Sequence, residues 1–363
     1  MKNIPINKPI VDDKEKEIVE RVISERYFVD QSFEGGKYVR MFEEELANFV
    51  HAKHAVAVNS GTSALIAALL AARIEHGDEV IVPSLTFIAT ANAVRAVGAR
   101  PVFADIDEYY TLDPAEVRKK LNKRVKAVIP VHLYGHTANM GELNELAEEF
   151  GIHIIEDAAQ SLGSTYDGRH TSTIGDMGCI SFYPGKVITT GEGGAVITDD
   201  DGLADRLKTV RNHGFDREGR LSGYGLNFRM QQMSAAIGYE QVKKLPKFLK
   251  ARERNAYTYI KELEAVSDKV MLPPIRDSSK YNWYLFTVRH PKREAAMRAL
   301  KENGIDSRIY YDPPVHKTPT YISQMSLPLT EMVARDVLSL PANPLVSEDD
   351  IVKISQLLKQ SLN

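Results

Sequence analysis

The sequence predicts an α/β fold, with a mostly parallel seven-stranded sheet covered by helices on both faces and a smaller α+β domain at the C-terminus. Between residues 54 and 198, short apolar runs typical of buried strands alternate with helical segments, a pattern that builds βαβ units. The last two runs are joined too tightly for a parallel crossover, which predicts an antiparallel pair. A chain of 363 residues can hold two domains, and we place them at 1–246 and 247–363.

Two amphipathic helices precede the sheet, over residues 12–26 and Tyr38–His51, because their apolar residues recur at helical spacing. The strands are expected at His54–Asn59, Glu79–Pro83, Arg100–Asp105, Ala127–Leu133, His153–Glu156, Gly178–Tyr183 and Gly194–Thr198. The helices between them are expected at Ser63–Ala72, Ala89–Val97, Pro114–Lys120 and Gly141–Phe150.

The chain after the last strand is expected to be helical at first. A helix over Leu203–Asn212 leads to a glycine-rich loop, His213–Gly225, which either reaches a partner or is a plain surface connection. Pro246 is expected to interrupt the next helix, dividing it into Gln231–Leu245 and a domain-bridging helix, Lys247–Leu263. The small domain is expected to contain strands at Tyr281–Arg289 and Ile305–Tyr310 and helices at Lys292–Asn303 and Asp349–Leu362.

Composition argues against several classes of protein. The net charge of -3 argues against a nucleic-acid partner, which would favour a basic excess. No apolar run reaches the length of a membrane-spanning helix, and the N-terminal residues lack the apolar core of a signal peptide. Cys179 is the single cysteine, so no disulfide can form within the chain. The sequence therefore indicates a cytoplasmic enzyme without a membrane partner or a metal site.

A lysine and an aspartate follow two of the predicted strands. Lys186 lies in a glycine-rich turn between two apolar runs, where desolvation of an ammonium is costly and lowers its pKa. Asp157 lies at the carboxyl end of a strand, where ligands bind in α/β sheets. A pyridoxal phosphate (PLP) site needs a lysine to hold the aldehyde and a carboxylate to pair with the ring nitrogen. A lysine that faces water and a carboxylate that caps a helix are the alternatives at these positions.

The segment Asn59-Ser60-Gly61-Thr62-Ser63 joins the first predicted strand to a helix. Free backbone N–H groups and the helix dipole make such a start a site for phosphate, although simple capping by a hydroxyl is common. Phe87 follows the second predicted strand, where its ring either stacks on a ligand or packs in the core.

Together, the motifs resemble one family. The chain resembles the PLP-dependent sugar aminotransferases of the DegT/DnrJ/EryC1/StrS family, within the aspartate aminotransferase-like fold type I, and the resemblance covers most of its length. The matching segments, in the family's order, are Asn59–Ala64, Pro83–Thr90, Glu156–Gln160, Ser181–Gly194 and Asn227–Met230. The resemblance also implies seven strands with one antiparallel member.

The resemblance implies a role for each residue of the predicted site. Lys186 would hold PLP and move the proton in the 1,3-transfer, and Asp157 would keep the ring nitrogen protonated. Phe87 and Ala159 would lie on the two ring faces, and Gln160 would donate to the 3-hydroxyl oxygen. The residues implied for the cofactor phosphate are Gly61, Thr62, Ser181 and, from a neighbouring subunit, Asn227.

A phosphate contact from a neighbouring subunit implies a homodimer with shared active sites, although Asn227 could instead cap the helix that follows. The resemblance also places His213, Tyr310 and His316 at the border of a sugar pocket.

The predicted function is transfer of an amino group from an amino acid, glutamate, to a nucleotide-linked keto-sugar. The segment around Lys186 favours a 4-keto-6-deoxy sugar through Thr189–Gly194, whereas Ser181–Lys186 resembles enzymes that act at C3. A sugar dehydratase of the family would lack Lys186, and a cysteine desulfurase would need a loop cysteine, whereas Cys179 lies in a predicted strand. An amino-acid aminotransferase or a non-catalytic regulator on the same scaffold would share the fold.

Overall fold

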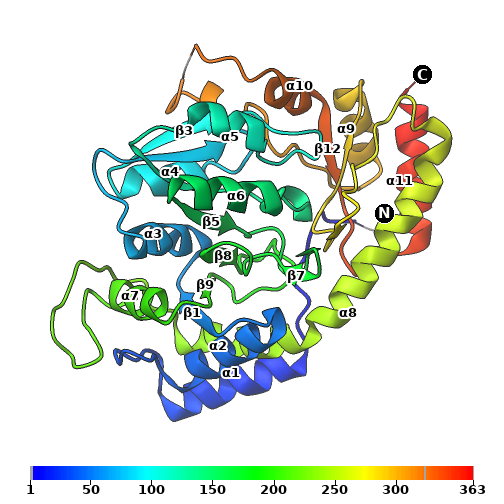
Figure 1. The fold of residues 1–363 in the computed structure, drawn as a ribbon. Helices are drawn as coiled ribbons and strands as arrows, with labels where there is room; N and C mark the ends of the chain where they lie inside the picture. The colour runs from blue at the N-terminus through cyan, green and yellow to red at the C-terminus, as the bar shows by residue number, and fades with distance from the viewer. Residues whose placement is uncertain (1–2, 323, 363) are drawn as a thin grey trace.

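A seven-stranded sheet forms the centre of the molecule (Figure 1). The structure is a computed structural model that describes residues 3–322 and 324–362. The strand order is β1-β9-β8-β5-β4-β2-β3. The strands are β1 (His54–Val58), β2 (Glu79–Pro83), β3 (Arg100–Ala104), β4 (Val125–Val128), β5 (His153–Asp157), β8 (Met177–Ser181) and β9 (Gly194–Thr198).

Strand β9 is the antiparallel member of this sheet. It pairs antiparallel with both β1 and β8, while β8, β5, β4, β2 and β3 pair in parallel. The prediction of a mostly parallel seven-stranded sheet with one antiparallel strand is confirmed. The short connection from β8 to β9 carries Lys186.

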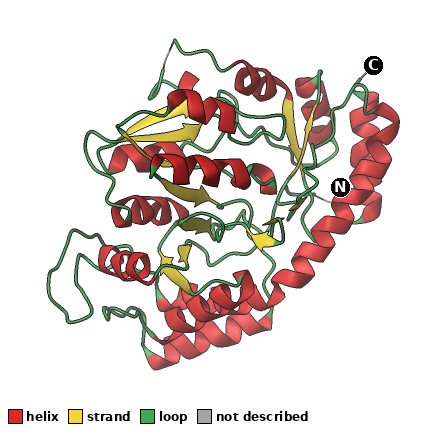
Figure 2. Ribbon diagram, in the orientation of Figure 1, coloured by secondary structure: helices red, strands yellow, loops and turns green. Residues whose placement is uncertain are grey.

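Helices cover both faces of the sheet, as predicted (Figure 2). Alternate residues of each strand point to opposite faces, so that Val56 and Val196 pack on one face and Ala57 and Ile197 on the other. The first face is covered by α3 (Gly61–Ala71), α4 (Ala89–Ala96) and α7 (Asp201–Arg211). The second face is covered by α1 (Asp13–Glu25), α2 (Lys37–Val50), α5 (Pro114–Lys120), α6 (Met140–Phe150) and the first half of α8 (Gln232–Leu263).

The predicted interruption at Pro246 is wrong, because α8 is one helix of 32 residues with Pro246 inside it. A proline in a helix removes one backbone hydrogen bond, but packing at both ends can hold the helix together. Val242 and Leu245 pack with α1 and α2, whereas Tyr259 and Leu263 pack in the C-terminal cluster. Figure 1 shows α8 running from α1 and α2 to the side of α11.

The C-terminal part forms a small α+β unit around its own apolar cluster, as predicted. Ile4, from the start of the chain, packs in the same cluster. The division into domains at residue 246 stays a prediction. The elements of this part are the antiparallel pair β11 (Phe286–Arg289) and β12 (Val337–Leu340), with α9 (Arg293–Glu302), α10 (Pro328–Asp336) and α11 (Glu348–Gln360).

Both predicted C-terminal strands need correction. β11 begins only at Phe286, because Trp283 has a left-handed backbone (φ 51°) and the Asn282 side chain bonds the neighbouring loops in place of a strand ladder. The segment predicted as a strand from Ile305 makes only isolated bridges, from Ile305 to Ile4 and from Arg308 to Ser339.

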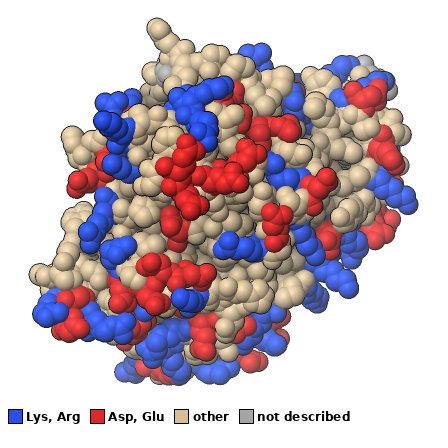
Figure 3. Space-filling view, viewed as in Figure 1, with Lys and Arg blue, Asp and Glu red and all other residues tan. Residues whose placement is uncertain are grey.

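A small three-stranded sheet lies beside the main one, formed by β10 (Ser279–Lys280), β6 (Thr165–Tyr166) and β7 (Arg169–His170). Short 3₁₀ turns occur at Leu133–Gly135, Glu264–Val266 and Val315–Lys317. Acidic and basic side chains are interspersed over the face shown in Figure 3. Within the described part of the chain, the helices are all too short or too polar to cross a bilayer.

Candidate active site

A cavity of about 290 Å³ lies at the carboxyl ends of β5 and β8 and the start of α3. It contains most of the residues that the sequence predicted for the site. Those that line it are Gly61, Thr62, Phe87, Asp157, Ala159, Gln160, Ser181, Lys186 and Tyr310.

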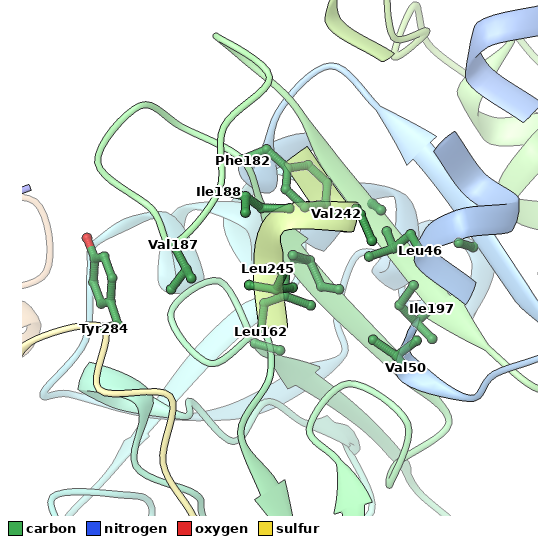
Figure 4. Packing of buried hydrophobic residues seen from close by; sticks show 14 of the residues in the cluster. Leu46, Val50, Leu162, Phe182, Val187, Ile188, Ile197, Val242, Leu245 and Tyr284 are labelled. Atoms are coloured by element: carbon green, nitrogen blue, oxygen red, sulfur yellow. The ribbon is translucent and has the colours of Figure 1, made fainter. Parts of the chain in front are cut away.

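The loop that carries Lys186 is anchored on both sides. Phe182 donates its backbone N–H to the Gly193 carbonyl (2.9 Å), and the backbone N–H of Lys186 bonds the Tyr183 carbonyl (2.8 Å). Phe182, Val187 and Ile188 are buried in the cluster that includes Val242 and Leu245 of α8, as Figure 4 shows. The apolar side chains on either side of Lys186 therefore fix its backbone while its own side chain lines the cavity.

The Lys186 ammonium lies in an environment that favours its neutral form. Burial lowers the pKa of Lys186 to about 8, and the charge of Asp157 opposes this shift. Its Nζ lies 5.2 Å from the centre of the Tyr284 ring. A lysine with a pKa of about 8 is roughly one-tenth free amine at pH 7, far more than a lysine with the ordinary pKa. A nucleophile or a base requires this free amine.

Asp157 is buried at the end of β5. Its Oδ2 accepts from the Thr90 hydroxyl (2.8 Å), and its Oδ1 accepts from the Ala159 backbone N–H (3.2 Å). Burial raises the pKa of Asp157, and these two hydrogen bonds and the Lys186 charge oppose the shift. The alternative in which Asp157 caps a helix is wrong, because residues 159–163 form turns and β6 (Thr165–Tyr166) follows.

The neighbouring carboxylate, Glu156, has a structural role. Its side chain is fully buried and accepts from the backbone N–H groups of Ser172 (2.9 Å), Ile174 (2.7 Å) and Gly175 (2.8 Å). His132 accepts from Ala138 N through Nδ1, so its Nε2 carries the proton donated to Glu156 (2.8 Å). Of this acidic pair, Asp157 alone lines the cavity.

The start of α3 faces the same cavity. Ser60 caps the helix by accepting from the Ser63 N–H (3.1 Å), and the N–H groups of Gly61 and Thr62 precede the first intrahelical donor. A Cβ at Gly61 would lie 2.7 Å from the Cβ of Ser181, so only glycine allows the helix start and the Ser181 hydroxyl to lie this close. Unsatisfied N–H groups beside a hydroxyl form a site suited to a phosphate.

Gln160 has its amide orientation fixed by its neighbours. The Tyr134 backbone N–H can only donate, and it bonds Oε1 of Gln160 (2.8 Å). The amide nitrogen therefore faces the cavity side, where it donates to the Tyr311 hydroxyl (3.2 Å) and keeps a second hydrogen free.

Comparison with known proteins identifies the family. Residues 12–359 match the model of the DegT/DnrJ/EryC1/StrS aminotransferase family. The chain belongs to this family. The aminotransferase uses PLP, which confirms the cofactor predicted from the sequence.

Individual relatives carry different names. The aminotransferase is 39% identical over 343 residues to dTDP-3-amino-3,4,6-trideoxy-alpha-D-glucose transaminase of Streptomyces venezuelae, covering 93% of this chain and 89% of the relative. It is 38% identical over 321 residues, 86% of each chain, to a pleiotropic regulatory protein of Geobacillus stearothermophilus. Among solved structures, DesV of S. venezuelae in complex with a ketimine intermediate matches with a TM-score of 0.91 and 37% identity, covering 98% of both chains.

The donor set of the cavity fits PLP. Gly61 and Thr62 supply N–H groups and Ser181 a hydroxyl at one end, while Asp157 supplies a carboxylate and Lys186 an amine at other points of the wall. These groups match the phosphate, ring nitrogen and aldehyde of PLP. The cavity volume of about 290 Å³ lies just below the range for ligand pockets, which is about 300–1,000 Å³.

Three predicted residues of the aminotransferase lie outside this cavity. Asn227 is exposed and lines a neighbouring cavity of about 420 Å³, which shares Glu192 with the first. It does not cap α8, which begins at Gln232 after Gln231. His213 is exposed and lines a separate groove. His316 is fully buried, where its Nδ1 bonds the Ser84 hydroxyl (2.6 Å) and its Nε2 lies 3.2 Å from Glu331.

An aromatic wall and two hydroxyls of the site were not expected from the sequence. Tyr183, Tyr284 and Tyr311 line the cavity, with the Tyr311 ring 5.8 Å from that of Phe87. Thr86 also lines the cavity, and Thr90 lies behind Asp157. Two of the motifs that carry the family resemblance contain Tyr183, Thr86 and Thr90. Their position inside these motifs could have identified them as residues of the site.

Proposed function

We propose that the enzyme transfers an amino group from glutamate to the keto carbon of a nucleotide-linked 4-keto-6-deoxy sugar. The observation that carries this proposal is the position of Lys186, whose pKa is lowered to about 8, in one cavity with the buried Asp157. The tyrosine hydroxyls of the cavity wall can donate to and accept from sugar hydroxyls, which suits a carbohydrate substrate.

Bound PLP supplies a ring that withdraws electrons from the substrate carbon. In the proposed mechanism, the Asp157 carboxylate would pair with the ring nitrogen and so hold a proton there. The Nζ of Lys186 would hold the cofactor covalently until the substrate amine replaces it there. The freed amine would then take the proton from the substrate carbon and return it to the cofactor carbon on the other side of the nitrogen. Lys186 thus acts first as a nucleophile and then as a base.

The remaining residues of the site bind and orient. The N–H groups of Gly61 and Thr62 and the hydroxyl of Ser181 would bind the cofactor phosphate, since the start of α3 stabilises an anion. The free amide hydrogen of Gln160 points toward the cavity side and would donate to the 3-hydroxyl oxygen. Phe87 and Ala159 would lie on opposite faces of the ring, with Phe87 in an offset stack.

A 3-keto sugar is the second candidate substrate. It is favoured by the 39% identical relative, whose name specifies a 3-amino sugar. The tyrosines of the cavity wall do not by themselves distinguish a 3-keto from a 4-keto sugar, because a hydroxyl can donate to or accept from the sugar in either case.

A panel of nucleotide-linked 4-keto-6-deoxy and 3-keto sugars, incubated with glutamate and the purified enzyme, tests the proposal. We expect an amino sugar with the amine at C4, identified by mass spectrometry and nuclear magnetic resonance, with 2-oxoglutarate formed in equal amount. Product with the amine at C3 would select the second candidate. Amino transfer to keto acids without any transfer to sugars would contradict both candidates.

We infer further that the enzyme is a homodimer in which Asn227 completes the partner's site. Asn227 is exposed in a cavity that adjoins the main one through Glu192. Val29 lines the same cavity and is 48% exposed, and the preceding Phe28 is 45% exposed. The loop between α7 and α8 extends outward (Figure 1) and exposes Tyr224. Apolar side chains around a polar cavity suit contact with a second copy.

Mixing the inactive Lys186→Ala variant with an impaired Asn227→Ala variant tests this arrangement. We expect Asn227→Ala to weaken PLP retention, because it removes a phosphate contact in the partner's site. Lys186→Ala subunits, dissociated and reassociated with Asn227→Ala subunits, then form heterodimers in which both defects fall in one site and the other site is intact. Activity above that of either parent supports sharing. An impaired Asn227→Ala variant in a protein that sediments as an active monomer would refute it.

A further inference from the structure

We propose that Thr90, supported by Thr86, is a positioning residue that holds Asp157 charged and correctly oriented toward the cofactor ring. Thr90 lies in the first turn of α4 and is fully buried, and Thr86 lies four residues earlier, in the bend that precedes the helix. The Thr90 Oγ1 is 2.8 Å from Asp157 Oδ2 and 2.9 Å from Thr86 Oγ1. The proposal rests on the role of Asp157 in the proposed function.

The direction of these hydrogen bonds follows from the charge of Asp157. An ionised carboxylate can only accept, so the single hydroxyl proton of Thr90 is donated to Asp157. The Thr90 oxygen is then free to accept from the Thr86 hydroxyl. The Phe87 carbonyl, 3.2 Å from Thr90 Oγ1, is the alternative acceptor for the Thr90 proton. Thr90 can donate to this carbonyl alone only when Asp157 is protonated and itself donates to the Thr90 oxygen. The hydroxyl chain from Thr86 to Asp157 is therefore aligned to support the charged state.

Asp157 needs such support because it is buried at the end of β5. Burial raises its pKa, and the Thr90 hydrogen bond is the first of the interactions that lower it, before the Ala159 N–H and the charge of Lys186. The other titratable groups that Asp157 influences are Cys179 and Tyr311, whose pKa values are raised mainly by burial. The Cys179 thiol and the Tyr311 hydroxyl are neutral near pH 7, so neither one supplies a positive charge that would stabilise the Asp157 carboxylate.

The two hydrogen bonds also fix the carboxylate plane. Thr90 holds Oδ2 from the side of α4, and the Ala159 N–H holds Oδ1 from the turn after β5. Each carboxylate oxygen has further lone pairs, so an N–H group of a ligand can still bond the carboxylate. Without Thr90, one of these two anchors is lost and the side chain is free to rotate about its terminal torsion.

Thr90→Val and Thr90→Ser form a matched pair for the test. Valine keeps the shape and removes the hydroxyl, whereas serine keeps the hydroxyl and removes the methyl group. The dissociation constant of PLP is measured by absorbance with each purified apo-protein across a range of pH. Thermal melting of the same apo-proteins shows whether each variant is folded.

We expect Thr90→Val to weaken PLP binding about tenfold or more at neutral pH, as for loss of a hydrogen bond to a charged group. The acid side of its binding profile should move to higher pH, because a carboxylate that loses a donor is protonated at higher pH. Thr90→Ser should stay close to wild type in both measurements. If valine unfolds the protein, Thr86→Val provides the second variant and should give a smaller shift in the same direction.

Equal binding and equal pH profiles for wild type, Thr90→Val and Thr90→Ser would overturn the proposal. Equal losses in the valine and serine variants would also overturn it, because they would indicate packing by the methyl group. Failure of the proposed function looks different: the wild-type protein would then bind no PLP, or would bind PLP and aminate no sugar.

Discussion

Lys186→Ala is expected to abolish transamination and to remove the covalent link between the protein and PLP. No other lysine lines the cavity within the described part of the chain, so no nearby amine can replace it. Loss of the base alone is expected to cost roughly 10²–10⁴-fold in rate, and loss of the covalent link adds to this. Rate and the visible absorbance of the bound cofactor, before and after borohydride reduction, measure both effects.

Lys186→Arg is the matched control, because it keeps the positive charge but does not lose its proton near neutral pH. It should be as inactive as alanine. In the wild-type protein, a pKa lowered to about 8 predicts that the rate of covalent PLP attachment rises as pH passes through 8, where the amine loses its proton. A reduced but PLP-linked Lys186→Ala protein, found by peptide mass mapping, would show that another lysine is used.

The main sheet could be predicted closely because its strands are buried on both faces. Such strands read as continuous apolar runs, as in Val80–Val82 of β2, and helices separate most of them in the chain. The strands of the small sheet have only two residues each, such as Arg169–His170, so their sequences carry no periodic signal. α8 was divided wrongly because the effect of Pro246 is local, whereas the packing that overrides it involves α1, α2 and α11.

Some residues of the candidate site could likewise be predicted from the sequence, and others could not. The position of Asp157 in the cavity could be predicted because a charged group at the end of a buried strand is unusual. The position of Lys186 could be predicted because a lysine in a glycine-rich turn between two apolar runs is costly to desolvate. Tyr311 could not, because it reaches the cavity from 151 residues beyond Gln160, and its neighbours carry no motif. His316 shows the limit of residue type alone: a histidine in a proline-rich segment could border a ligand, but here its ring bonds Ser84 and Glu331 inside the protein.

Asp157→Asn is expected to leave the fold and some PLP binding intact but to lower the rate by several orders of magnitude. Asparagine has nearly the same shape and can still accept from the Ala159 N–H, but it has no charge with which to keep the ring nitrogen protonated. Loss of one neutral hydrogen bond would cost only about 0.5–1.5 kcal/mol. A rate within a few fold of wild type would therefore show that the carboxylate does not act on the ring.

The stability of the apo-protein provides an independent measure of the same carboxylate. Burial raises the folded-state pKa of Asp157 above its unfolded value, so the folded state loses stability from this group as pH rises through the folded-state pKa. Asparagine removes that loss. The Asp157→Asn apo-protein should therefore melt at a higher temperature than wild type at pH 7, and the difference should shrink as pH falls toward about 4, where the unfolded carboxyl is also protonated. A lower melting temperature at pH 7 would mean that Thr90, Ala159 and Lys186 more than offset the cost of burying the charge.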